Sequence, residues 1–191
     1  MSDAIGAILT GGKSSRMGRD KADVVIGGKT MLELVAAAMR EVTHQVVLLG
    51  GDREGWVCWP DAVHATGPLA GVTTALTRAG SDRVLVVAVD QPFVRTATLA
   101  GILAIDSALP VVPVDTTGSR QVTCSVYPTS IADAALDEAA NGGSIQTLLD
   151  RVSFRPVAAD EWNRWGEDGR SWYSVDTEEA LATGQGLFSS G

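Results

Sequence analysis

The stretch Val84-Leu-Val-Val-Ala-Val-Asp-Gln-Pro-Phe93 begins with an unbroken apolar run and ends with an aspartate and a proline close behind it. Such a run is typical of a strand inside a parallel sheet, because helices cover both faces of that kind of sheet. A weaker run at 152–157 alternates apolar and polar residues, which is typical of an edge strand. The other candidate strands are residues 4–9, 46–49, 111–114 and 122–127.

Segments of helical character separate these runs. Thr30-Met-Leu-Glu33 is a capping box that opens a helix ending at about Glu41. Further helices are predicted at 69–78, 96–108, 130–140 and 144–149, several of them rich in alanine, the strongest helix former. Strands that alternate with helices predict an α/β fold around a mainly parallel sheet. We expect one domain over residues 1–191, with a frayed tail at 184–191.

The composition argues against several classes of protein. Among 191 residues, 23 acidic side chains against 15 basic ones give a net charge of −8, which repels the phosphate backbone of a nucleic acid. No apolar run approaches the ~20 residues that a bilayer demands. Cys58 and Cys124 are too few for a disulfide framework, and with His44 and His64 they show no zinc spacing. We therefore expect free thiols and a cytoplasmic protein that binds neither nucleic acid nor membrane.

The glycine-rich beginning of the chain contains two incomplete phosphate motifs. Gly12-Lys13-Ser14 and Gly28-Lys29-Thr30 both end like a P-loop, which needs a glycine five positions before its Gly-Lys pair. Those positions hold Ala7 and Asp23. The dinucleotide-binding pattern with three spaced glycines is also incomplete after the strand at 4–9. Neither of the two common phosphate motifs is present.

The same segment still indicates an anion site. Two glycines follow the first strand, and four cations lie within the next nine residues of an acidic protein, at Lys13, Arg16, Arg19 and Lys21. Glycine lets backbone N–H groups approach an anion closely, and the cations neutralise its charge. The alternative is a basic surface loop, but open α/β sheets bind ligands at the carboxyl ends of their strands, where this segment begins.

The form Gly-Gly-x-Ser-x-Arg-Met-Gly-x-Asp-Lys at 11–21 resembles the nucleotide-binding signature of the molybdenum cofactor guanylyltransferase family. Two more blocks, at 67–71 and 86–93, resemble that family in order and spacing, and 118–127 and 172–181 do so more weakly. The resemblance implies the fold of the sugar nucleotidyltransferases. That fold is a three-layer α/β/α sandwich whose Rossmann-like, mainly parallel sheet includes an antiparallel strand.

The resemblance also implies roles for individual residues. Lys21 would contact the phosphates, Asp90 would hold Mg²⁺, and Arg16 would grip the leaving pyrophosphate. Asp61 would contact the nucleotide, with Asp52 as a competing candidate. The remaining nucleotide-binding positions would be Leu9, Thr10, Gly11 and Gly12. The position of Asp90 agrees with such a role, since one or two carboxylates plus substrate phosphates are the usual surroundings of Mg²⁺.

Two features near the end of the chain keep alternatives open. Asp176 is either a second Mg²⁺ ligand or the N-cap of a last helix, and the cap is the preferred interpretation. Trp162, Trp165 and Trp172 stand among charged residues, where they either pack on the core or belong to a surface flap. Packing is the preferred interpretation there.

The activity implied by the resemblance is transfer of GMP from GTP to the phosphate of molybdopterin or the molybdenum cofactor, with release of pyrophosphate. Mg²⁺ would be the cofactor, and a molybdoenzyme or a cofactor-delivery protein would be a transient partner. A cytidylyltransferase on the same pterin, or a nucleotidyltransferase for another phosphorylated acceptor, is the alternative within this class. From another class, the alternative is a nucleotide-binding cofactor carrier without turnover.

Overall fold

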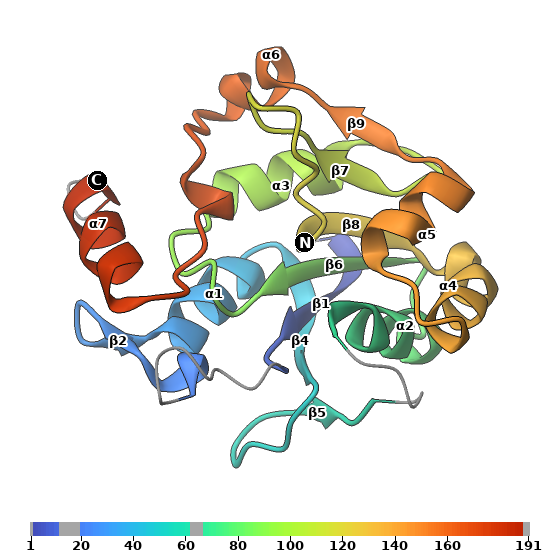
Figure 1. Cartoon of the computed structure of the whole chain (residues 1–191), viewed down its shortest axis with the longest axis horizontal. Coiled ribbons are helices and arrows are strands. Elements are labelled where there is room, and N and C mark those ends of the chain that lie inside the picture. Colours follow the sequence, from blue (N-terminus) through green and yellow to red (C-terminus); the bar gives the residue numbers. More distant parts are fainter. Residues whose placement is uncertain (1, 12–19, 62–66, 189–191) are drawn as a thin grey trace.

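A computed structural model of the chain describes residues 2–11, 20–61 and 67–188. Its central element is a seven-stranded sheet with the order β5-β4-β1-β6-β8-β7-β9 (Figure 1). The strands are β1 (Ser2–Leu9), β4 (Thr43–Leu49), β5 (Cys58–Trp59), β6 (Arg83–Ala88), β7 (Val111–Pro113), β8 (Cys124–Pro128) and β9 (Arg155–Val157). The apolar run at 84–89 therefore forms the strand at the centre of the sheet.

The sheet is mainly parallel. β1 pairs in parallel with both β4 and β6, β4 with β5, and β7 with β9. β8 runs antiparallel to both of its neighbours, β6 and β7. The predicted mainly parallel sheet with an antiparallel strand is confirmed, and β9 occupies the edge position predicted for the run at 152–157.

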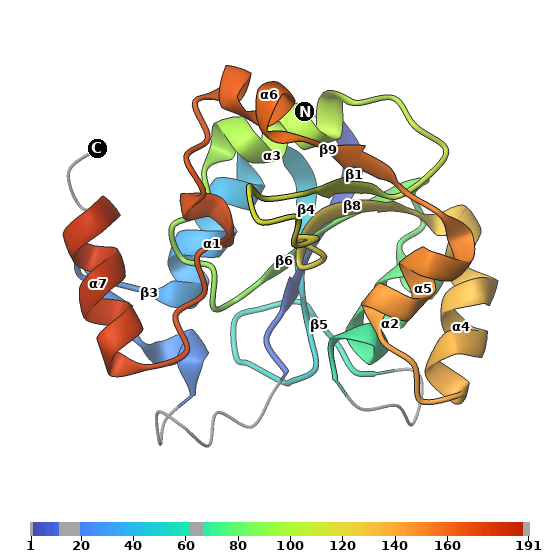
Figure 2. The ribbon, with the colours of Figure 1, turned by 45° about the horizontal axis from the view of Figure 1, so that its top comes forward.

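Helices cover both faces of the sheet. α1 and α3 lie on one face, and α2, α4 and α5 lie on the other (Figure 2). The helices are α1 (Met31–Arg40), α2 (Pro68–Arg78), α3 (Thr96–Ala104), α4 (Ala132–Ala140), α5 (Ile145–Val152), α6 (Ala159–Trp162) and α7 (Glu178–Phe188). The predicted three-layer α/β/α sandwich is confirmed. None of the helices in the described part of the chain combines the length and apolar character needed to cross a bilayer.

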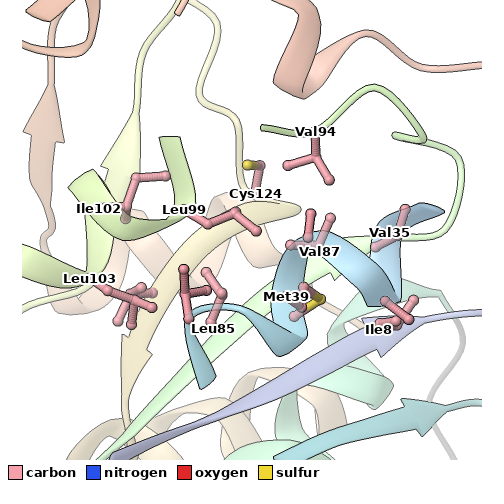
Figure 3. Packing of buried hydrophobic residues seen from close by; sticks show 14 of the residues in the cluster. Ile8, Val35, Met39, Leu85, Val87, Val94, Leu99, Ile102, Leu103 and Cys124 are labelled. Atoms are coloured by element: carbon pink, nitrogen blue, oxygen red, sulfur yellow. The ribbon is translucent and has the colours of Figure 1, made fainter. Parts of the chain in front are cut away.

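The apolar run of β6 serves both faces at once. Leu85 and Val87 point into the core under α1 and α3, while Val84 and Val86 point into the core under α2. Figure 3 shows the first of these cores, in which Ile8 of β1 gathers with Leu85, Val87 and side chains of both helices. Successive side chains of a strand alternate between faces, so a strand covered on both sides needs apolar residues at every position.

The start of α1 follows its local sequence signal. The side chain of Thr30 accepts a hydrogen bond from the Glu33 N–H (3.2 Å), and the Glu33 carboxylate accepts one from the Thr30 N–H (2.7 Å). These reciprocal bonds confirm the predicted capping box. They satisfy two of the backbone donors that a helix start leaves without partners.

Some elements differ from the prediction. β5 and the hairpin of β2 (Val25–Ile26) and β3 (Lys29–Thr30) are too short for a periodic pattern to reveal. α3 ends at Ala104 rather than at 108. The expected frayed tail is helical up to Phe188, because α7 extends that far and Gly184 is buried in it. Residues 189–191 lie outside the described part.

The tryptophans near the end of the chain pack on the core. Trp162 is buried and donates from its Nε1 to the carbonyl oxygen of Val114 (3.0 Å). The ring of Trp165 lies directly over Gly101 of α3, where a Cβ atom would come within 2.2 Å of it. Trp172 contacts Trp162 edge to face, with ring centroids 5.3 Å apart. The packing interpretation is therefore correct for this segment.

The two cysteines give a first test of this fold. Both are free, Cys58 half-buried at β5 and Cys124 fully buried at the start of β8. Burial raises the pKa of the Cys124 thiol, and the thiol form does not react as a nucleophile. We predict that a thiol reagent modifies only Cys58 in the native protein. After denaturation without reductant it modifies both residues.

The control is Cys58→Ser, which should abolish the native reaction and leave one reactive thiol after denaturation. Rapid modification of Cys124 in the native protein would contradict its place in the core. Absence of any free thiol in the denatured protein would contradict the assignment of both cysteines as unpaired.

Candidate active site

The carboxyl ends of the two central parallel strands meet at one edge of the sheet. Leu9 of β1 is in register with Ala88 of β6, and the Val89 N–H donates to the Leu9 carbonyl oxygen (3.0 Å). A cavity of about 360 Å³ lies there. Its lining comprises Leu9, Thr10, Gly11, Asp20, Lys21, Pro68, Ala88, Val89, Asp90, Gln91, Gln121, Thr123, Trp172 and Ser174. This is the position at which open α/β sheets bind ligands.

Lys21 is the central charge of the cavity. Its Nζ lies 3.0 Å from Asp90 Oδ2 and also donates to Asp176 Oδ1. Partial burial lowers the pKa of Lys21, but its bonds to Asp176 and Asp90 outweigh that effect, so the pKa is raised overall. Lys21 is therefore a permanent cation that joins segments separated by 69 and 155 positions in the chain.

Asp90 follows β6 and is held by its backbone as well as by its charge. Its carbonyl oxygen accepts a hydrogen bond from the Val175 N–H (2.8 Å), and its carboxylate bonds Lys21. The Asp90 side chain does not cap the next helix, because α3 begins after Arg95 with no side-chain cap hydrogen bond. The carboxylate therefore faces the cavity instead of a helix end.

Asp176 is not the cap of the last helix, contrary to the preferred interpretation of the sequence. Thr177 has that role: its Oγ1 accepts from the Ala180 N–H (3.1 Å), and its carbonyl oxygen accepts from the Leu181 N–H (2.9 Å). The carboxylate of Asp176 instead bonds Lys21 and accepts from the Ser174 hydroxyl (2.9 Å). Because the cap lies one residue later, the Asp176 carboxylate can bind Lys21, which lines the cavity.

A smaller cavity of about 190 Å³ adjoins the first and has glycine walls. It is lined by Leu9, Gly11, Leu49, Gly50, Asp61, Gly67, Pro68 and Gly71. Partial burial raises the pKa of Asp61. Asp52 does not line this cavity but a neighbouring one, which Asp61 shares. Of the two competing aspartates, Asp61 is therefore the one that lines this cavity together with Gly11.

Close backbone contact shapes the wall of this smaller cavity. A Cβ atom on Gly50, which follows β4 with φ at +84°, would lie 2.9 Å from Gly11 Cα. Thr10 continues the pairing of β1 and β4, with both its N–H (3.0 Å) and its hydroxyl (2.8 Å) donating to the Leu49 carbonyl oxygen. The backbone just beyond the two strands approaches this closely because the residues that meet, Gly11 and Gly50, are both glycine.

Several residues singled out in the sequence are not among these contacts. Gly12, Lys13, Arg16 and Arg19 lie outside the described residues, as does His64. His44 is exposed on β4, close to the strand's amino end and thus away from the cavity.

Sequence reasoning did not identify the individual residues of the opposite wall. Gln121, Thr123, Trp172 and Ser174 line it. The amide of Gln121 donates to Asp115 Oδ2 (2.9 Å), and the Thr123 carbonyl oxygen accepts from the Ala88 N–H (2.9 Å). The only signal was the weak resemblance at 118–127 and 172–181, which marks both segments without pointing to any of these side chains.

The carboxylates of Asp90 and Asp176 are chemically suitable ligands for Mg²⁺. No group of three or more His, Cys, Asp or Glu side chains within residues 2–11, 20–61 and 67–188 is arranged to hold a metal ion. Asp90 and Asp176 nevertheless both reach the same ammonium group. Mg²⁺ is usually bound by one or two carboxylates together with water and substrate phosphates, and not by a site made of protein ligands alone. Two carboxylates are therefore enough for such a site.

Comparisons with known proteins agree on one family. The model of the MobA-like NTP transferase domain matches residues 6–156. A molybdenum cofactor guanylyltransferase of Xanthomonas euvesicatoria is 37% identical over 100 residues, which are 52% of this chain and 53% of that protein. One of Desulfosudis oleivorans is 25% identical over an alignment of 199 positions, which covers 99% of this chain and 98% of that protein. The chain spans about half the length of several of the curated relatives it matches.

A solved structure has the same fold over nearly the whole chain. It is the crystal structure of molybdopterin-guanine dinucleotide biosynthesis protein A from Archaeoglobus fulgidus, with a TM-score of 0.82 and 21% identity. The match covers 98% of this chain and 100% of that one.

The close contact between Gly11 and Gly50 gives a prediction about stability. The control is Gly142→Ala, which places a Cβ at a positive φ in open space and should lower the free energy of unfolding by about 1–2 kcal/mol. Gly50→Ala adds a clash with the Gly11 backbone, so we expect a further loss of about 1–3 kcal/mol. Denaturant unfolding of both variants measures the difference. Equal losses would contradict the close approach of the two strand ends.

Proposed function

Because this chain belongs to the MobA-like NTP transferase domain family, we propose that it transfers GMP from GTP to the phosphate of molybdopterin or the molybdenum cofactor and releases pyrophosphate. The observation that carries the proposal is the cluster of Lys21, Asp90 and Asp176 between a glycine-walled cavity and a second wall. The names of the relatives support the choice of nucleotide and acceptor.

The cavity by the glycines suits the nucleoside of the donor. Gly11, Gly50, Gly67 and Gly71 contribute no side chains, so a flat base can approach the backbone. The carboxylate of Asp61 supplies an acceptor there, which suits the hydroxyls of a ribose and the N–H donors of a guanine. The nucleoside would therefore lie beside β4, with its phosphates directed toward Lys21.

The opposite wall suits the acceptor. Gln121 and Ser174 offer polar groups, and Trp172 offers an aromatic ring. This combination of one aromatic surface with a few polar groups is common in sites for small organic molecules. A pterin carrying a phosphate would face this wall and bring its phosphate to the centre of the cavity.

Transfer would proceed by in-line displacement at the α-phosphorus. The attacking phosphate oxygen is already anionic and needs no general base, and no histidine of the described residues lines the cavity. The protein contributes position and charge: Lys21 neutralises charge on the phosphates, while the backbone N–H of Gly11 adds a hydrogen bond. Asp90 and Asp176 would hold Mg²⁺, which when bound neutralises phosphate charge.

A carrier without turnover has less support. Such a protein needs the nucleoside cavity but not a lysine held between two carboxylates beside it. A different base or a different phosphorylated acceptor would use the same central cluster, so these alternatives differ only at the two walls. We also propose a cytoplasmic location and transient contact with a molybdoenzyme or a cofactor-delivery protein.

The proposed function predicts which nucleotide base the site prefers. A ligand that binds only the folded state stabilises it by mass action, by about 2.7 kcal/mol when present at roughly 100 times its Kd. With Mg²⁺ present, GTP should therefore raise the melting temperature more than CTP, ATP or UTP at equal concentration. Equal shifts from all four would contradict the guanine assignment and leave a general triphosphate site. A larger shift with CTP would favour the cytidylyltransferase.

The second prediction separates the two central charges. Asp90→Asn preserves shape but removes a hard ligand, so pyrophosphate release should fall roughly 100-fold, with partial recovery in excess Mg²⁺. Lys21→Ala should lose a comparable rate without recovery, because the missing cation belongs to the protein. Circular dichroism of both variants controls for folding. Near-normal pyrophosphate release by both folded variants would contradict the mechanism.

A further inference from the structure

We infer that Arg53 is a positioning residue that holds Lys21 at the phosphates, an inference that rests on the proposed function. Arg53 lies in the connection between β4 and β5, outside the lining of the cavity that contains Lys21. Its guanidinium binds the carboxylates of Asp20, which precedes the short turn that carries Lys21, and of Asp23, the last residue of that turn.

The segment around Lys21 is too short to hold its own shape. Lys21–Asp23 is a single 3₁₀ turn, and turns of this length have few hydrogen bonds and poor geometry. Asp20 is its N-cap, with Oδ1 accepting from the Ala22 N–H (2.9 Å). An isolated turn of this kind depends on contacts from elsewhere in the fold to keep one position.

Arg53 provides such contacts on both sides of Lys21, in addition to the packing of the buried Ala22 side chain in the core. Its Nη2 donates to Asp20 Oδ2 (2.8 Å), so both oxygens of that carboxylate are engaged. Its Nη1 donates to Asp23 Oδ1, and Nη2 also lies 3.5 Å from Asp23 Oδ2. One planar guanidinium thus binds both ends of the turn. A lysine at this position has a single ammonium group and cannot form the same paired bonds to two carboxylates.

The backbone that carries Arg53 is itself ordered by local contacts. The Arg53 carbonyl oxygen accepts from the Trp56 N–H (3.2 Å). The guanidinium of Arg40 on α1 lies over the Trp56 ring, with its Cζ 4.7 Å from the ring centroid. β5, which follows, pairs with β4. The turn that carries Lys21 is therefore tied to the sheet through Arg53.

The role of Arg53 is distinct from general stabilisation. The side chains of Asp20 and Asp23 are 53% and 57% exposed, and exposed ion pairs add little to global stability. Displacement of a group that must meet phosphate oxygens, by contrast, has large effects on binding and rate. Loss of Arg53 should thus leave the fold intact and reduce the contribution of Lys21.

The experiment is a double-mutant cycle between Arg53 and Lys21. Isothermal titration calorimetry measures the affinity for inorganic pyrophosphate of the unaltered protein, Arg53→Met, Lys21→Ala and the double variant. We expect Arg53→Met alone to weaken pyrophosphate binding about tenfold. In the Lys21→Ala background the same change should have an effect of less than about twofold, because the group that Arg53 positions is absent.

Three further variants complete the test. Arg151→Met is the matched control, since Arg151 also binds two carboxylates, Asp137 (3.1 Å) and Glu138 (4.0 Å), between α4 and α5. It should leave pyrophosphate affinity unchanged. Arg53→Lys keeps the charge and should recover only part of the affinity. Asp23→Asn should weaken binding less than Arg53→Met does, because the bond to Asp20 remains.

The outcomes separate this inference from the proposed function. An equal loss in both Lys21 backgrounds, or no greater loss for Arg53→Met than for Arg151→Met, would overturn the inference. A protein that binds pyrophosphate but releases none from any nucleotide contradicts the proposed function alone, and the cycle still tests Arg53. A protein that binds neither GTP nor pyrophosphate contradicts both. If Arg53→Met fails to fold, Arg53→Lys and Asp23→Asn take its place in the cycle.

Discussion

The ammonium group of Lys21 between Asp90 and Asp176 is the interaction on which the site depends. Each partner comes from a different part of the chain: the turn after the glycine-rich segment, the end of β6 and the approach to α7. Because both aspartates contact the same ammonium group, their negative charges would repel each other if the lysine cation were absent. The lysine thus brings an early and a late segment of the chain to the same strand end.

The sheet explains why these segments meet. Parallel pairing of β1 with both β4 and β6 brings three strand ends to one edge, and Gly11 and Gly50 allow the first two to touch there. The segment that leads into the antiparallel strand β8 supplies Gln121 and Thr123 to the other wall, because β8 begins opposite the end of β6. A mixed sheet therefore gives the cavity two walls of different chemistry, glycine backbone on one side and polar and aromatic side chains on the other.

The parts that sequence could predict are those fixed by local chemistry. The apolar run of β6 and the capping box of α1 reveal themselves within a few residues, and Asp90 is found from its place after that run. Asp176 shows the limit: Asp176 and Thr177 are both good cap residues, and the carboxylate of Asp176 binds a lysine 155 positions away, which no local pattern reveals. The positions of Trp172 and Gln121 in the cavity wall could not be predicted for the same reason, since nothing near them in sequence distinguishes a cavity wall from ordinary packing.

The hydrogen bond from the Val175 N–H to the Asp90 carbonyl oxygen has a consequence for how such proteins diversify. It ties a segment beyond the region matched by the family model, 6–156, to the strand end in the middle of that region. The glycine-walled cavity is lined by residues before 72, whereas Trp172 and Ser174 of the other wall belong to this late segment. Under the proposed function, changes to the late segment would alter which acceptor binds without changing the donor side, so donor and acceptor preference could evolve separately.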